Sequence, residues 1–180
     1  MVPVFIISYL TAQSSCSFLQ TILPLCFSIA AYELMSEQQR RENHMQYGMA
    51  LSSYTLVNCP NNNELFCTAV AQINQGDMSA VSDPSQKMLL AKLNLKAGKL
   101  SIVLSDYASA LSLFEHGISY LGDDKWTSNY DTSLDLFDAA AEAACVLNKN
   151  TAVASYTEEL VANAKSFDDS LNCEYSCCRV

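Results

Sequence analysis

Four carboxylates recur between residues 131 and 142 at the spacing of one helix face. Asp131, Asp135, Asp138 and Glu142 follow one another at intervals of four, three and four residues, which places them on one side of an α-helix. Such a row could bind metal or act as a general acid pair, but a di-iron site needs a second helix with Glu-x-x-His, which the chain lacks. We interpret the row as a solvated acidic face that could dock a basic segment of a partner protein.

Two aromatic residues and two histidines are the remaining candidates for a site. Trp126 and Tyr130 open the helix that carries the carboxylates, where they either pack a hairpin or contact a ligand or partner. His44 and His116 have no Cys, Asp or His placed to complete a nucleophile–base pair or a metal site. The sequence therefore predicts no catalytic, cofactor-binding or metal-binding residue and no enzyme. It leaves a partner-docking face made of Trp126, Tyr130 and the four carboxylates.

The eight cysteines do not form a recognisable site. The spacing Cys173-x-x-x-Cys177-Cys178 has no second ligand pair at zinc-finger distance, so we expect a reduced tail. Cys59, Cys67 and Cys145 lie in or beside apolar helical patterns and are expected to pack as small hydrophobic residues.

Charge and composition exclude several classes of partner. The 180 residues contain 10 Lys and Arg against 19 Asp and Glu, which gives a net charge of -9. Nucleic acids and anionic membrane surfaces both require a basic face, so neither is expected as a partner. Only five glycines are present, and the pair Gly98-Lys99 has no glycine five residues before it, so no P-loop is expected. Half of the residues are hydrophobic, which is enough for a folded core.

The first 30 residues differ from the rest of the chain. Residues 1–32 carry no charged side chain, and polar residues interrupt their apolar stretches before the ~18–20 residues of a membrane span are reached. Ser28-Ile29-Ala30 fits a signal-peptide cleavage site, but no Lys or Arg follows Met1. Two interpretations remain: a signal or anchor of a secreted or membrane-tethered protein, or a non-native or buried leader on a cytoplasmic one. The cytoplasmic location is the expected one.

From residue 31 onward the apolar periodicity predicts successive helices. Ser36 and Gln39 form a capping box at the start of the first, and Asp83-Pro84 starts the third. Gly76 is expected to supply a left-handed cap, and Gly98 would allow a break in the third helix. The expected helices cover about residues 36–54, 65–75, 84–104, 105–121, 127–147 and 151–167.

The inward faces of these helices predict the fold class. The third helix has an apolar stripe made of Leu89, Leu93, Ala97, Leu100 and Leu104. No such stripe can be buried by one helix alone. Antiparallel hairpins packed side by side bury them, so the sequence predicts an all-α protein of stacked helical hairpins, a short solenoid.

Two stretches support a repeat. Residues 104–114, which contain Asp106-Tyr107, Ala110 and Phe114, are similar to the turn and second helix of a tetratricopeptide repeat. Residues 147–154 look like a second, degenerate copy. The two turns lie about 44 residues apart, counted from Asp106 to Asn150, against 34 in the standard repeat.

A longer resemblance covers roughly residues 30–172. Its blocks are Ala30–Arg40, Leu90–Gly98, and the segment from Phe114 through Trp126 and Tyr130 to the Ala-rich stretch 139–144. Together they resemble the tetratricopeptide-like helical region that follows the nucleotide-binding module in large AAA- or STAND-type ATPases, often fused to Ser/Thr kinase and sensor histidine kinase domains. The Walker and kinase motifs are absent, so the resemblance implies the helical region alone.

The sequence thus predicts four segments: an uncharged leader (1–30), a helical lead-in (31–80), tetratricopeptide-like hairpins (81–170) and a Cys-rich tail (171–180). The expected function is a non-catalytic helical-repeat module that binds a protein partner or the absent ATPase and kinase domains. The alternative is a small secreted or membrane-tethered helical protein in which residues 1–30 are a signal or anchor.

Overall fold

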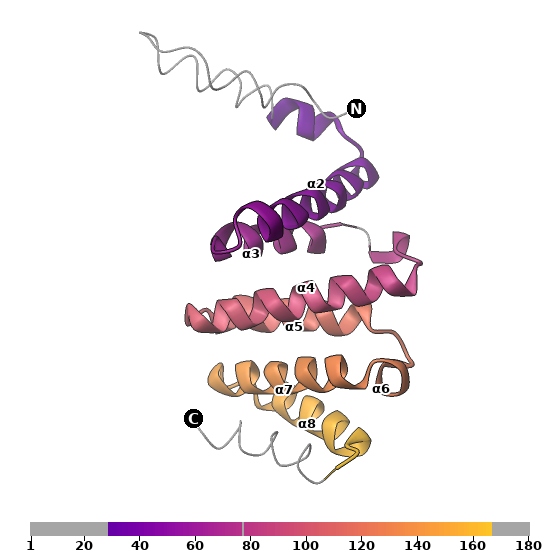
Figure 1. Ribbon diagram of the computed structural model, residues 1–180, viewed down its shortest axis with the longest axis vertical. Coiled ribbons are helices and arrows are strands. Elements are labelled where there is room, and N and C mark those ends of the chain that lie inside the picture. The colour runs from indigo at the N-terminus through magenta and orange to yellow at the C-terminus, as the bar shows by residue number, and fades with distance from the viewer. Residues whose placement is uncertain (1–28, 77, 167–180) are drawn as a thin grey trace. The chain divides into compact units, whose positions relative to one another are not determined.

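The structure, a computed structural model, describes residues 29–76 and 78–166. Within these ranges it contains helices and no strand, which confirms the all-α prediction. The Cys-rich tail and residues 1–28 of the leader lie outside the described residues. The elements are α2 (Glu37–Asn58), α3 (Asn63–Asn74), the 3₁₀ helix η2 (Met78–Ala80), α4 (Pro84–Val103), α5 (Tyr107–Tyr120), α6 (Lys125–Ser128), α7 (Tyr130–Val146) and α8 (Asn150–Asn163) (Figure 1).

The chain forms two compact units that divide after Arg40, within α2. In the first unit, residues 29–34 are helical and the predicted capping box is present. The amide of Ser36 donates to Oε1 of Gln39 at 2.9 Å, and the amide of Gln39 donates to Oγ of Ser36 at 3.2 Å. The Arg40 guanidinium lies 5.0 Å from the centre of the Tyr32 ring and fixes the helical turn before Ser36.

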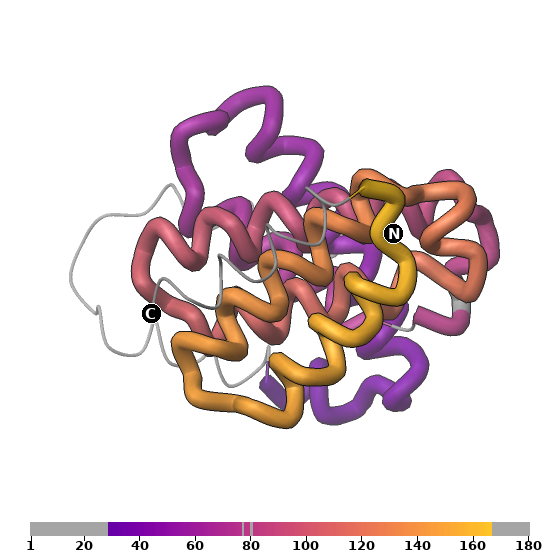
Figure 2. The backbone as a smooth tube through the Cα atoms, turned by 90° about the horizontal axis from the view of Figure 1, so that it is seen from below, coloured from indigo at the N-terminus to yellow at the C-terminus, as the bar shows by residue number. Residues whose placement is uncertain are grey.

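The second unit is built from helices that pair with their neighbours along the chain. In each pair the contacts run antiparallel: His44 of α2 meets Gln72 of α3, while Gly98 of α4 faces Phe114 of α5. In the α7–α8 pair, the hydroxyl of Tyr130 at the start of α7 accepts a hydrogen bond from the amide of Lys165 just after α8. The α2–α3, α4–α5 and α7–α8 pairs succeed one another along the unit (Figure 1) and overlap when viewed along that direction (Figure 2). Within these three pairs, the helices thus run antiparallel to one another.

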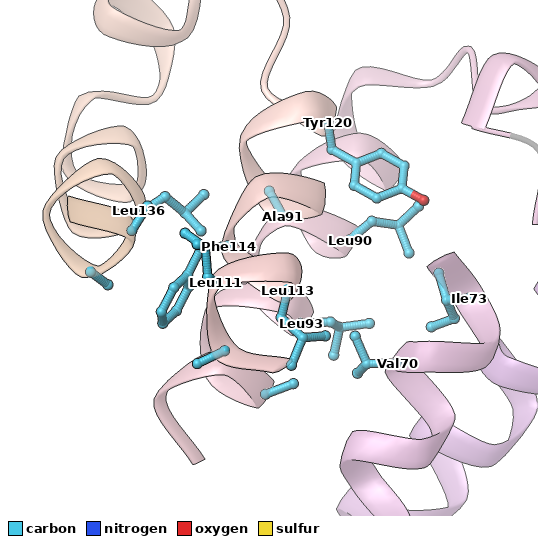
Figure 3. Packing of buried hydrophobic residues seen from close by; sticks show 14 of the residues in the cluster. Val70, Ile73, Leu90, Ala91, Leu93, Leu111, Leu113, Phe114, Tyr120 and Leu136 are labelled. Atoms are coloured by element: carbon cyan, nitrogen blue, oxygen red, sulfur yellow. The ribbon is translucent and has the colours of Figure 1, made fainter. Parts of the chain in front are cut away.

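One core cluster runs through the second unit. Phe114 of α5 is fully buried, and it lies beside Leu136 of α7 (Figure 3). On the other side of the α4–α5 pair, Leu93 lies near Val70 of α3 (Figure 3). Burial of a large aliphatic or aromatic side chain stabilises a fold by about 1.5–3 kcal/mol, so this continuous cluster holds the neighbouring pairs together.

Glycines permit the closest helix contacts. A Cβ built on Gly98 would lie 2.3 Å from Cε1 of Phe114, so the bare backbone of α4 receives the Phe114 ring. The helix is continuous there, and the break allowed by the sequence does not occur. The prediction for Gly76 is wrong, because only Gly122 among the glycines has a positive φ. Gly76 instead lies against Met45, where a Cβ would come within 2.9 Å of that side chain.

The turns after α4 and after α7 have the same geometry. Ser105 and Asn148 adopt left-handed backbone conformations, with φ of 61° and 57°. Around Ser105, the amide of Asp106 donates to the carbonyl of Ser101 at 2.9 Å. Around Asn148, the amide of Lys149 donates to Ala144 at the same distance. Both are Schellman-type helix ends. Ser105 and Asn148 lie 43 residues apart, close to the spacing of about 44 expected from the sequence between Asp106 and Asn150.

Two helix predictions need correction. Leu89 and Leu104 do not belong to the inward face of α4, since they are 46% and 65% exposed. The buried face is rotated and includes Leu90, Leu93 and Ala97. The helix expected over residues 127–147 is interrupted at Asn129, where φ and ψ are −138° and 35°. There the hydroxyl of Ser133 donates to the carbonyl of Lys125 at 2.9 Å and joins the short α6 to α7.

Candidate functional site

The four carboxylates lie along α7 as predicted, but they do not form a uniformly solvated row. Asp131 and Asp135 are exposed, whereas Asp138 and Glu142 are half-buried. The difference arises because α7 packs against both α5 and α8, which leaves Asp138 and Glu142 partly covered. Oδ2 of Asp135 also lies 2.7 Å from Nζ of Lys99 on α4. The exposed carboxylates available to a basic partner are therefore concentrated at the N-terminal half of α7.

Trp126 lies at the junction between α6, α7 and α8. Its ring centre is 5.2 Å from that of Phe137, and its indole Nε1 donates to Oε1 of Glu159 at 2.8 Å. Nζ of Lys125 lies 3.3 Å from the same oxygen. The indole hydrogen bond, aided by Lys125, lowers the pKa of the Glu159 carboxyl below its ordinary value. Trp126 is half-buried, and its hydrogen bond to Glu159 anchors α6, at the start of the α7–α8 hairpin, to α8.

Tyr130 makes a similar connection at the end of α8. Its hydroxyl accepts a hydrogen bond from the amide of Lys165 at 2.9 Å, and Nζ of Lys165 lies 3.8 Å from the centre of its ring. The Trp126 and Tyr130 rings meet edge to face at 6.0 Å. Both side chains are half-buried, so their partner-docking role stays a prediction while their packing role is visible in the structure.

Tyr156 of α8 makes a hydrogen bond that links the α7–α8 hairpin to the α4–α5 hairpin. Its hydroxyl donates to Oε1 of Glu115 on α5 at 3.1 Å. Burial, together with the negative charge and hydrogen bond of Glu115, raises the pKa of Tyr156 to about 12. The phenol therefore remains a neutral donor at physiological pH, which suits a structural contact and not a general base.

Two of the remaining candidate nucleophiles and bases, His44 and Cys67, have local structural partners. Nδ1 of His44 lies 2.7 Å from Oε1 of Gln72, and His116 is half-buried on α5. The Cys67 thiol donates to the carbonyl of Ala97 at 3.7 Å, and burial raises its pKa, which lowers its thiolate fraction. Over residues 29–76 and 78–166, no three His, Cys, Asp or Glu side chains are grouped so as to hold a metal ion.

A basic face on α4 was not singled out from the sequence. Lys92, Lys96 and Lys99 are exposed on one side of this helix, between the exposed apolar residues Leu89 and Val103. Their spacing of four and three residues is the same kind of signal that drew attention to the carboxylates. The signal was present in the sequence, but the predicted apolar stripe extended to Leu89, which lies at the edge of this basic face.

Comparison with protein-family models, with curated proteins and with solved structures gives no match to this chain. Among the described helices, none combines the length and the apolar character needed to cross a membrane.

Proposed function

We propose that this chain is a non-catalytic helical-repeat module that binds another protein, similar in role to the tetratricopeptide-like regulatory region of AAA- or STAND-type signalling ATPases and kinases. The observation that carries the proposal is the repetition of one hairpin at a shift of 43 residues. Ser105 and Asn148 occupy equivalent left-handed turns with equivalent hydrogen bonds.

The same shift relates the buried residues of the two long helices. Leu93 and Ala97 of α4 correspond to Leu136 and Ala140 of α7, and all four are buried. A shift that reproduces both a turn and a burial pattern supports two copies of one structural unit. Repeated hairpins that stack on their neighbours present helix faces that are suited to binding extended or helical partners.

The proposal includes a cytoplasmic, reducing setting. Cys59, Cys67 and Cys145 are half-buried, as expected for small apolar residues in a helical core. Counting thiols on the native protein tests this part of the proposal. Eight reactive thiols on denatured, unreduced protein are expected, and paired cysteines would favour the secreted alternative.

The interaction role is tested with the full chain. The tagged chain is expressed in source cells, and a protein that co-purifies with it is identified and prepared separately. Binding of the two pure proteins is then measured by calorimetry. We expect one-to-one binding that charge reversals on exposed helix faces weaken without changing helicity. Absence of binding between the pure proteins would refute the interaction role.

An antibody to residues 84–166 tests the relation to ATPases. On a blot of source cells, a native band far above 19.8 kDa would indicate that these residues are part of a larger chain.

A further inference from the structure

The exposed side of α4 combines positive charge with uncovered apolar surface. Leu89, Lys92, Lys96, Lys99 and Val103 recur at intervals of three or four residues, so they share one helix face. Leu89 is 46% exposed and Val103 is 77% exposed. We call these five residues the basic strip. Its charged centre and apolar ends span about 21 Å, since 14 residues of helix rise ~1.5 Å each.

The lysines of the basic strip are held weakly by the chain itself. Lys92 forms no ion pair with any described residue, and the Lys96 ammonium lies 4.8 Å from the centre of the Phe66 ring on α3. Lys99 pairs with Asp135 of α7, but the two side chains are 55% and 52% exposed. An exposed pair of this kind contributes little stability, so Lys99 can exchange Asp135 for a carboxylate of a partner.

The strip borders a shallow recess with an apolar base. The recess has a volume of about 380 Å³, and Leu95 and Leu100, both half-buried, lie in it beside the lysines. Each can bury further apolar area if a side chain is placed over it. The residues that line the recess are Lys92, Leu95, Lys96, Lys99, Leu100 and Val103.

The charge of the strip contrasts with that of the chain. The protein has a net charge of -9 and only 10 basic residues, three of which lie on this face. An acidic partner is repelled by most of the molecule and attracted here, so the charge distribution selects both the partner and its position. A basic partner would be attracted by most of the molecule and repelled by the basic strip.

We propose that the basic strip binds an acidic amphipathic helix of a partner protein. Carboxylates at helical spacing pair with Lys92, Lys96 and Lys99, and apolar side chains at the two ends of that helix cover Leu89 and Val103. This inference rests on the proposed interaction function and names the chemistry of its partner. It differs from the docking of a basic segment on α7 that the sequence suggested.

A synthetic helix tests the pairing. The probe is a fluorescein-labelled peptide of about 20 residues with glutamates three and four apart and a leucine near each end, matching the ~21 Å strip. Its control has the same composition in scrambled order. Binding to the full chain is followed by fluorescence anisotropy at low and at high salt. Two variants carry the same change of charge: Lys92→Glu in the strip and Lys149→Glu at the exposed start of α8.

The expected result is a preference for the patterned peptide, lost at high salt because exposed charges are screened. Lys92→Glu should weaken binding about fivefold, and Val103→Ser about threefold, while Lys149→Glu changes it less than about twofold. Equal losses in Lys92→Glu and Lys149→Glu would overturn the proposal, because they would indicate general attraction. Equal binding of the scrambled peptide, or of a single-stranded 20-mer DNA, would overturn it as well.

Two further measurements separate the remaining explanations. Sedimentation of the wild-type chain should give a monomer, and a dimer that dissociates in Lys92→Glu would assign the strip to a second copy instead. The purified partner of the interaction test is then offered to Lys92→Glu. Unchanged partner binding together with weakened peptide binding would refute the basic strip while leaving the interaction function intact, whereas similar weakening of both supports the strip.

Discussion

Gly98→Ala should destabilise the protein although alanine is the better helix former. In an exposed helix interior this substitution stabilises by about 1 kcal/mol. Gly98, however, faces the fully buried Phe114, and an added Cβ would lie 2.3, 2.7 and 2.7 Å from three atoms of its ring. Ordinary carbon contacts are about 3.5–4 Å. The ring, enclosed between α4 and α7, has to move or force the helices apart.

The expected magnitude follows from these opposing effects. Overpacking of a core costs about 1–3 kcal/mol, and a contact of 2.3 Å with a confined ring belongs at the upper end. Subtracting the gain in helix propensity of about 1 kcal/mol leaves a net loss of about 2 kcal/mol. For a chain of this size, the midpoint of thermal unfolding should fall by about 4–8 °C.

Urea and thermal unfolding, followed by circular dichroism, measure this loss. Ser112→Ala on the exposed side of α5 is the control, because it raises helix propensity without changing the packing of the core. Phe114→Leu should remove the clash, so Gly98→Ala should destabilise the Phe114→Leu background at least ~1 kcal/mol less than it destabilises wild type. A Gly98→Ala variant as stable as wild type or more stable, or strict additivity with Phe114→Leu, would refute the close approach of α4 and α5.

Three other substitutions test the turns and the polar contacts. Ser105→Gly should stabilise the fold by about 0.5–1 kcal/mol in urea unfolding, because φ is 61° there. Burial and Glu115 raise the pKa of Tyr156 to about 12, so its stabilising contribution is complete below the unfolded pKa of about 10 and is lost as pH rises to about 12. Tyr156→Phe should therefore flatten the fall in unfolding free energy over that range; an unchanged slope would contradict it. Asn74→Ala should cost about 1–3 kcal/mol in unfolding free energy, since the buried Asn94 amide exchanges hydrogen bonds of 2.7 and 3.1 Å with Asn74.

Local sequence signals predicted the starts of helices well. Ser36 with Gln39 and Asp83 with Pro84 act through side chains and backbone a few residues away, so their effect does not depend on the rest of the fold. The amides of Ser85 and Gln86 do bond to the Asp83 carboxylate. The role of Gly98 could not be read locally, because it depends on Phe114 sixteen residues later.

The periodicity of side chains was less informative about their surroundings. It placed Asp131, Asp135, Asp138 and Glu142 on one helix but could not show that α5 and α8 would cover part of that helix. For α4 it selected a stripe that includes the exposed Leu89. Leucines occur on both sides of that helix, so hydrophobicity alone does not identify the buried side. The packing partners decide it, and they come from distant parts of the sequence.

The packing of each helix pair mainly against its neighbours has a consequence for motion. α4 contacts α3, α5 and α7, whereas α8 contacts chiefly α7. Opening of α8 therefore breaks contacts chiefly with α7, together with the Tyr156–Glu115 and Trp126–Glu159 hydrogen bonds, while opening of α4 breaks extensive contacts with three helices. Backbone amides of α4 and α5 should exchange with deuterium through the rarest openings and those of α8 through far more frequent ones. Opening of α8 alone would leave the contacts of α4 with α3 and α5 in place.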